Sequence, residues 1–409
     1  MTCCRIGVSR PLILSVRGDI KHLQPCGWRV AIYLNKPTIS QNIVLNLQPP
    51  DFLVVFVLLS QGASVANTTS ALTSARKKKN DEFYTQRSDI EKELNNYNHL
   101  SKHNHFKDKV VFCNCDDPTE SNFFKYFADN FSALGLKKLI CTHYEPDENK
   151  KSYVLTITRG RDINNDGKTN RHDVEKTEML FSNGDFRSPE CIELLKQSDI
   201  VCTNPPFSLF REYVAQLMEY NKKFLIIGNQ NAITYKEIFP LIKENKIWLG
   251  CTMNGSNRWF RVPDNYENTP AIKIGDGQDG FEKGVKYCFV KAVVWFTNMD
   301  CQKRHDEFIP RNYKNFNESE YQKYDNYDAI NVDNVNNIPV DYYGVLGVPI
   351  TFLHKHNPEQ FEIIGATESE GKGFSCGIWR GGIAQPVVNG KRIFKRLFIR
   401  RKKETKNGN

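Results

Sequence analysis

Short apolar runs alternate with segments of helical periodicity over residues 88–228. The runs lie at 110–113, 138–142, 198–202 and 224–228, and each is bounded by polar residues, as in buried parallel strands. Helices are predicted to begin at Ser88 and to cover residues 123–131, 188–197 and 210–220. A β-rich run at 285–297 predicts antiparallel strands that complete the sheet. Strands that alternate with helices predict an α/β fold with a doubly wound, mixed sheet.

A Pro-Pro pair follows the third of these strands. After residues 198–202 the chain continues as Thr203, Asn204, Pro205, Pro206 and Phe207. Proline cannot donate a ladder hydrogen bond, so the chain has to leave the sheet at the carboxyl end of the strand. Ligands of open α/β sheets bind at that edge. This loop is therefore the first candidate site.

The four residues from Asn204 to Phe207 resemble the catalytic motif of amino-group methyltransferases, which use S-adenosylmethionine to methylate exocyclic nitrogens of bases. The exocyclic amine of adenine is a poor nucleophile because its lone pair is delocalised into the ring. The side-chain oxygen of Asn204 and the carbonyl of Pro205, held rigid by Pro206, would accept its two hydrogens and free the lone pair. Phe207 would stack on a flipped base. The alternative is a structural loop without a catalytic role.

A wider resemblance begins at about Ser74 and runs to the end of the chain. Over this length the sequence resembles the EcoRI-type adenine-specific DNA modification methylases. The matching segments are 81–86, 109–118, 121–127, 203–210, 223–233 and 347–353. The resemblance implies a Rossmann-like catalytic domain that uses S-adenosylmethionine, with double-stranded DNA as the substrate and a target adenine that flips out of the helix. It further implies a GAATTC-like site and a type II restriction–modification setting, in which a cognate endonuclease shares the site without forming a stable complex.

The resemblance also assigns cofactor-binding residues after the first two strands. The turn at 113–118 lacks the glycines of the usual pattern, but Asp116 and Asp117 offer a charge-assisted bond to the methionine ammonium group. Asp116 is the preferred residue of the two. Glu145 follows the second strand, where an acid normally binds the ribose hydroxyls, and simple surface exposure is the alternative. No spacing of cysteine and histidine residues predicts a metal site.

Two aromatic segments complete the expected cofactor site. Residues 183–186 resemble the turn whose acid accepts a hydrogen bond from the adenine amine of the cofactor. This assigns Asp185 to that bond and Phe186 to stacking. Phe83 and Tyr84 resemble the N-terminal element that closes over the cofactor in this class, and packing in the core is the alternative.

The charge balance of the chain agrees with a nucleic-acid partner. The 56 Lys and Arg residues against 47 Asp and Glu give a net charge of +9, which favours a polyanion such as nucleic acid. A polar loop predicted at 251–261 offers candidate DNA contacts. These are Asn254, Asn257, Arg258 and Trp259. Residues 311–345 could either contact a DNA groove or form a solvated loop, and both interpretations stay open. The basic run 391–403 could be either a final strand with a basic tail or an arm that contacts phosphates.

Composition divides the chain into three segments. Residues 1–73 are expected to be an extension that is disordered or spuriously translated, 74–300 the catalytic domain, and 301–409 a target-recognition region with a basic tail. The apolar run at 52–59 is too short to cross a membrane. The 12 cysteines form no disulfide framework, which predicts reduced thiols in a cytoplasmic protein. A monomer without membrane contact is expected.

Two other classes of function remain open. One is a methyltransferase of another amine, either N4 of cytosine or the glutamine side chain of a protein. The basic charge and the long region after the sheet argue against a protein substrate. The other is a non-catalytic DNA-binding module with the same fold, and the intact motif at Asn204 argues against it.

Overall fold

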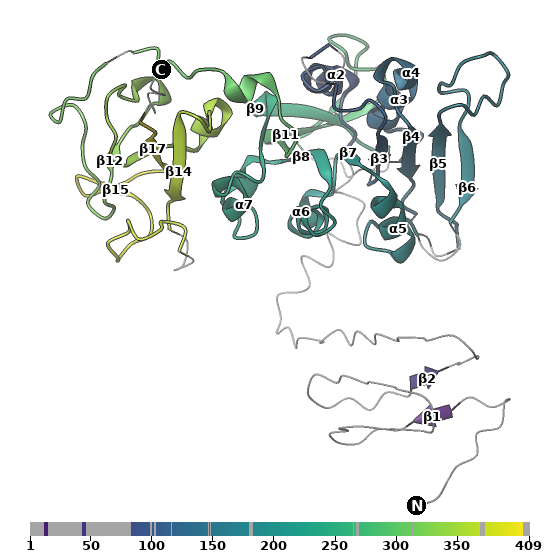
Figure 1. Cartoon of the computed structure of the whole chain (residues 1–409), viewed down its shortest axis with the longest axis horizontal. Coiled ribbons are helices and arrows are strands. Elements are labelled where there is room, and N and C mark those ends of the chain that lie inside the picture. Colours follow the sequence, from purple (N-terminus) through teal and green to yellow (C-terminus); the bar gives the residue numbers. More distant parts are fainter. Residues whose placement is uncertain are drawn as a thin grey trace, which may run out of the picture. The chain divides into compact units, whose positions relative to one another are not determined.

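The computed structural model describes residues 83–403, apart from 99, 102–103, 116, 146, 148, 180–182, 265, 267–269, 313 and 369–372. It also describes two short strands, β1 (Leu12–Leu14) and β2 (Ile43–Leu45), which pair antiparallel. The chain divides into two compact units, 1–70 and 71–409. Apart from β1 and β2, the expected extension at 1–73, with its apolar run at 52–59, lies outside the described residues. The second unit carries everything that follows (Figure 1).

A nine-stranded sheet forms the centre of the second unit. Its strands are β3 (Val110–Cys113), β4 (Lys138–Thr142), β5 (Tyr153–Thr158), β6 (Glu175–Glu178), β7 (Ile200–Thr203), β8 (Lys223–Asn229), β9 (Trp248–Arg261), β10 (Ile272–Ile274) and β11 (Lys286–Thr297). Their order is β10-β11-β8-β7-β3-β4-β5-β6, and β9 pairs with β11. The four central strands β8, β7, β3 and β4 are parallel, and the outer pairings are antiparallel. The predicted mixed α/β sheet is confirmed.

Helices cover both faces of this sheet (Figure 1). One face carries α2 (Arg87–Leu94), α3 (Asn122–Asp129) and α4 (Phe131–Leu134), and the other carries α5 (Pro189–Gln197), α6 (Phe210–Glu219) and α7 (Phe239–Lys243). The alternation of side chains along β3 explains this, because Val111 and Cys113 pack with the first group while Val110 and Phe112 pack with the second. No helix in the described part of the chain has the length and apolar character to span a bilayer.

A second, four-stranded sheet follows. It has the order β12-β13-β17-β14 and consists of β12 (Ile330–Asn331), β13 (Leu346–Pro349), β14 (Phe361–Ala366) and β17 (Arg396–Arg401). The expected final strand within 391–403 is β17. Tyr321, Tyr324 and Tyr327 are buried, so these three side chains belong to the core and neither read a DNA groove nor lie in a solvated loop. The hydrophobic core of the second sheet is continuous with that of the first, and the rings of Phe239 and Phe374 meet at 5.0 Å.

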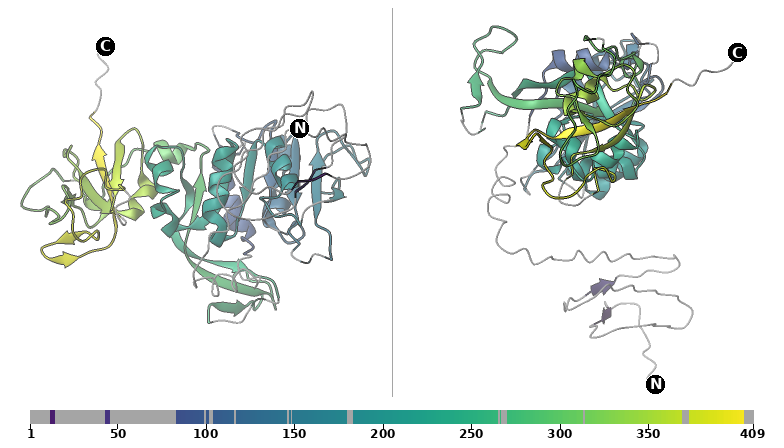
Figure 2. Two further views of the ribbon diagram at one scale, coloured as in Figure 1. Left: turned by 90° about the horizontal axis from the view of Figure 1, so that it is seen from below. Right: turned by 90° about the vertical axis from the view of Figure 1, so that its left-hand side faces the viewer.

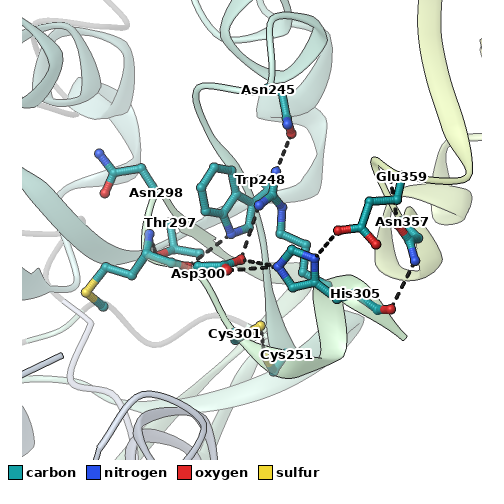
Figure 3. Close-up of polar contacts among 12 residues, drawn as sticks. Asn245, Trp248, Cys251, Thr297, Asn298, Asp300, Cys301, His305, Asn357 and Glu359 are labelled. Atoms are coloured by element: carbon teal, nitrogen blue, oxygen red, sulfur yellow. Dashed lines mark hydrogen bonds and ion pairs between the residues drawn. The ribbon is translucent and has the colours of Figure 1, made fainter. Parts of the chain in front are cut away.

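Residues 298–306, here called the junction, begin the connection from β11 to the second sheet (Figure 3). The imidazole of His305 lies between Asp300, at 2.8 Å, and Glu359, at 2.9 Å. The Arg304 guanidinium lies 3.7 Å above the ring of Trp248. Asn357 donates through Nδ2 to the carbonyls of His305 (3.1 Å) and Asp306 (3.2 Å). Ion pairs of His305 and hydrogen bonds from the Asn357 side chain therefore fix the path of the junction.

Candidate active site

The order of the parallel strands reverses between β3 and β7, because β4 lies on one side of β3 and β7 with β8 on the other. The turn after β3 and the loop after β7 therefore meet at one edge, which is where ligands of open α/β sheets bind. The Thr203 hydroxyl donates to the backbone carbonyl of Asn114, and the Tyr213 hydroxyl donates to the Asn114 side-chain oxygen. These two bonds join the turn, the loop and helix α6. Because the predicted catalytic motif lies here, we call this edge the catalytic edge.

Asn204 occupies the centre of the catalytic edge and is 5% exposed. Its Nδ2 donates to the backbone carbonyl of Phe83 at 2.6 Å. Only an N–H group can face a carbonyl at that distance, so the orientation of the amide is fixed. Its Oδ1 is buried and has no hydrogen-bond partner within the described part of the chain. A buried acceptor without a partner costs about 1–3 kcal/mol, so this oxygen is suited to receive a donor from a ligand.

An aromatic cluster lies beside Asn204. The ring of Phe207 is partly exposed, and its centroid is 5.7 Å from that of Phe83 at an interplanar angle of 37°. Phe83 also contacts Phe260 at 5.8 Å and Tyr266 at 6.1 Å. Among the predicted residues, the structure therefore brings Phe83 and Phe207 together with the Asn204 amide. A planar base entering here would meet aromatic surface.

The start of the described segment runs along the end of β9. Tyr84 and Arg261 exchange two backbone bonds, of 2.9 and 3.1 Å. The Gln86 side chain donates to the carbonyl of Trp259 at 3.0 Å. Tyr84 is itself 5% exposed, which agrees with the alternative of core packing for this residue. The pairing of Tyr84 with the end of β9 therefore holds the neighbouring Phe83 at the catalytic edge.

Acidic side chains surround a histidine at the ends of β3 and β4. Asp117 Oδ2 is 3.6 Å from Nδ1 of His143, and Glu145 Oε2 is 3.7 Å from Nε2 of the same ring. Burial, then the charge of Asp117, raises the pKa of Tyr153 to about 12, and this ring stacks on His143 at 4.7 Å. His143 was not among the predicted site residues, although its position directly after β4 was a usable signal. Asp116, the preferred cofactor residue, lies outside the described residues.

The turn after β3 compensates for its lack of glycine. Cys115 adopts φ +76°, the left-handed conformation that glycine usually supplies in such turns. The chain can therefore turn sharply at the carboxyl end of β3 without a glycine. Asp117 then accepts two hydrogen bonds from Thr119, at 2.9 and 2.7 Å, which hold one carboxylate oxygen in place.

Asp185 and Phe186 lie on the turn that precedes α5, and this turn is joined to Glu145, whose backbone N–H donates to the carbonyl of Asn183 at 2.8 Å. Arg187 donates to both carboxylate oxygens of Asp185, at 2.9 and 2.7 Å. Partial burial acts to raise the pKa of Asp185, but the bonds from Arg187 hold it below its usual range. Phe186 is 5% exposed and packs edge-on against Tyr213 at 5.0 Å. The carboxylate is thus engaged by a neighbour, and the ring lies in the core.

The prediction of a loop at 251–261 was wrong, because these residues are part of strand β9. Its polar sequence hid the pairing with β11, which satisfies the backbone while Asn254 and Asn257 stay exposed. Arg258 faces Asp89 at 3.8 Å, and Trp259 packs on Phe289 at 4.9 Å. The four candidate DNA contacts therefore lie along one strand, two of them exposed and two engaged with neighbouring side chains.

The outer ends of these strands form an arm, which consists of residues 256–261 of β9, strand β10 and residues 286–290 of β11. The last pair between β8 and β11 is Asn229 with Val293, so β11 continues beyond the carboxyl end of β8. Figure 2 shows the arm projecting from the body of the unit. The register shifts between Val290 and Val293, where Ala292 has φ +56°, mark its base. The arm thus leaves from the catalytic edge.

Comparison with known proteins agrees with this geometry. A family model described as adenine-specific methyltransferase EcoRI matches residues 71–403. The chain is 48% identical over 342 residues to the Type II methyltransferase M.EcoRI of Escherichia coli, a match that covers 82% of this chain and 98% of that protein. It is 43% identical over 294 residues to the Type II methyltransferase M.MpnI of Mycoplasma pneumoniae, covering 71% and 83%. No solved structure gives a match. The chain therefore belongs to the EcoRI family of adenine-specific DNA methyltransferases.

Proposed function

We propose that the protein transfers a methyl group from S-adenosylmethionine to N6 of an adenine that is flipped out of a short site in duplex DNA. The observation that carries the proposal is the buried, unpartnered Oδ1 of Asn204, beside a Phe83 carbonyl that fixes the amide. A flipped adenine brings an N–H donor to this oxygen. Family membership supports the reaction, and the open acceptor of Asn204 supports our proposal that it occurs at this edge.

The residues at the ends of β3 and β4 fit the cofactor. When bound, S-adenosylmethionine supplies an electrophilic methyl group on a sulfonium. Asp117, together with Asp116, offers negative charge for the methionine ammonium group, and Glu145 offers acceptors for the ribose hydroxyls. Asp185, beside Phe186, accepts a hydrogen bond from the adenine amine of the cofactor. This last role requires Asp185 to exchange part of its bonding with Arg187.

The chain acts on the target amine through two acceptors. Oδ1 of Asn204 and the carbonyl of Pro205 each accept one hydrogen, which draws the amine nitrogen towards tetrahedral geometry and frees its lone pair. Pro206 limits the motion of the loop, and Phe207 stacks on the base. The product proton is acidic enough to leave to water, so no strong general base is required. The acceptors are preorganised, because the Asn204 amide is held before the substrate arrives.

Recognition of the DNA is assigned to the arm and to residues 301–409. Asn254 and Asn257 are exposed on β9, and asparagine can read an adenine edge. Arg258 and Trp259 lie on the same strand with engaged side chains. We propose a GAATTC-like site, a monomeric enzyme acting in the cytoplasm, and a cognate endonuclease that shares the site without a stable complex.

Methylation of plasmid DNA tests the proposal directly. The purified chain and S-adenosylmethionine are incubated with the plasmid, and the modified base and its flanking sequence are read. N6-methyladenine at one short sequence is expected. N4-methylcytosine would move the protein to another class of substrate, and cofactor binding without any transfer would make it a DNA-binding module. The Asn204→Ala protein serves as the inactive control.

A further inference from the structure

A small hairpin, which precedes β17 and forms a two-stranded sheet of its own, has an ordered backbone. Strand β15 (Val387–Val388) pairs with β16 (Lys391–Arg392) across Asn389 and Gly390, whose φ values are +48° and +72°. Asp325 accepts hydrogen bonds from both turn amides, at 3.3 and 2.8 Å. This sequence and conformation are typical of a tight two-residue hairpin turn. The hairpin is therefore held to the body at its tip.

The chain that leaves the hairpin is held equally well. Ile393 donates to the carbonyl of Pro386 at 2.9 Å and accepts from the Gln385 side chain at 2.9 Å. The carbonyl of Phe394 accepts from Arg396 at 3.1 Å, and Arg396 is 7% exposed. The backbone on both sides of the Phe394 side chain is thus fixed.

The side chains on this fixed backbone are unusual. Phe394 is 86% exposed, the highest value of any large hydrophobic side chain in the described part of the molecule. Lys391, Arg392 and Lys395 are exposed beside it, and none of the three forms an ion pair with a described residue. A single exposed hydrophobic residue needs no explanation. An exposed aromatic ring on a fixed backbone, between three cations without a described ion-pair partner, is the pattern of a surface that meets stacked bases and phosphates.

The hairpin faces the same way as the arm. Both panels of Figure 2 show the hairpin, in yellow, and the arm, in green, projecting on the same side of the second unit. The arm leaves from the catalytic edge, where Asn204 lies. A duplex that brings an adenine to Asn204 therefore approaches the side on which the hairpin projects.

We propose that Phe394 is a wedge that inserts between base pairs next to the target site, while Lys391, Arg392 and Lys395 contact the flanking phosphates. The inference rests on the proposed duplex DNA substrate. Flipping an adenine unstacks its neighbours, and an apolar side chain inserted at a base step is a known way of stabilising such a distortion. The ring is presented on an ordered backbone, so little conformational entropy is lost on insertion.

Four variants of the full chain test the wedge. They are Phe394→Ala, Phe394→Trp, the triple change of Lys391, Arg392 and Lys395 to Gln, and Ile309→Ala as a control for the loss of an exposed hydrophobic side chain, since Ile309 is 63% exposed. The duplex carries the unmodified recognition sequence identified by plasmid methylation, with 2-aminopurine placed in turn at positions around the target adenine. Melting temperatures establish that each variant folds.

Phe394→Ala is expected to weaken duplex binding by about 5- to 150-fold, the range for loss of one base–aromatic stack. It should also abolish a 2-aminopurine fluorescence increase that the wild type produces at one step beside the target. Phe394→Trp should retain both properties, and Ile309→Ala should match the wild type. The triple variant should lower the slope of log Kd against log salt by about three.

Equal binding and fluorescence for Phe394→Ala and Ile309→Ala would overturn the wedge, as would an unchanged salt slope in the triple variant. In either case wild-type methylation would leave the proposed function standing. A wild type that methylates no DNA would instead remove the proposed function, and the inference with it.

Discussion

Asn204 at the catalytic edge and Asn357, which bonds to the junction, are buried to a similar extent, 5% and 3% exposed. Asn357 uses both ends of its amide, because Nδ2 donates to two carbonyls and Oδ1 accepts from the amide of Glu359 at 2.7 Å. Asn204 uses one end only, and its Oδ1 stays without a partner among the described residues. A satisfied amide stabilises the fold, whereas a buried acceptor left open is available to a ligand. Substitutions should therefore separate the two regions by what they damage.

The largest expected effect is that of Asn204→Ala on the methyl-transfer rate. Removing one preorganised acceptor lowers such rates on the order of 10²–10³-fold. Single-turnover methylation of DNA measures the loss, and equilibrium dialysis should show cofactor affinity close to that of the wild type. The melting temperature should fall less than for Asn357→Ala, because the lost oxygen has no described partner and only the Phe83 carbonyl loses its donor. Near wild-type turnover would exclude Asn204 from the mechanism.

Asn357→Ala should show the opposite pattern. It leaves the carbonyls of His305 and Asp306 and the amide of Glu359 without their partner, so the free energy of unfolding should fall by about 1–3 kcal/mol. Urea denaturation measures this, and Asn149→Ala, at an exposed position, should change stability by less than about 0.5 kcal/mol. The rate per folded molecule should be unchanged. A slower rate at full stability would contradict a purely structural role for Asn357.

Asp185→Ala tests whether the carboxylate that pairs with Arg187 serves ligand binding, as expected for Asn204, or the stability of the fold, as expected for Asn357. If the carboxylate binds the cofactor, the dissociation constant of the cofactor should rise about tenfold or more, since a hydrogen bond to a charged group contributes about 1.5–3 kcal/mol. DNA affinity should stay the same. A loss of melting temperature with unchanged cofactor affinity would place Asp185 among the structural residues.

The smallest expected effect is a pH dependence at the junction. The hydrogen bond to Asp300, then that to Glu359, raises the pKa of His305 above its usual range. The protonated ring therefore contributes stability below the unfolded pKa of about 6.5, and this contribution is lost as the pH rises through the folded value. Melting curves of the wild type and His305→Gln should differ more at about pH 5.5 than at about pH 9, by less than about 1 kcal/mol because the pair is partly exposed. A difference that grows with pH would contradict this assignment.

The central strands could be predicted because their residues are apolar and sharply bounded. Strands β3 and β4 have the predicted limits, and Asn204 lies at the expected edge. Strand β6 escaped prediction because three of its four residues are exposed and its sequence is Glu-Lys-Thr-Glu. Only its pairing with β5 makes it a strand. Local sequence identifies buried strands, and pairing partners decide the polar ones.

The same limit applied to the candidate site. Asn204 and Phe207 could be selected because two prolines mark their loop. The Phe83 carbonyl that orients Asn204 could not, because a backbone group 121 residues away leaves no trace in side-chain type. Strand β9 was taken for a loop because Asn254, Asn257 and Arg258 are polar, while its partner β11 supplies the pairing.

The continuous core between the two sheets has a consequence for protein engineering. Phe239 belongs to the first sheet's helix α7 and Phe374 to the second sheet's region, yet their rings pack together in one buried cluster. A chimera that exchanged residues 301–409 for those of a relative with another target site would replace half of that contact. Any exchange of residues 301–409 therefore requires the face of α7 to be transplanted with them, because the two sheets are joined by packing as well as by the chain.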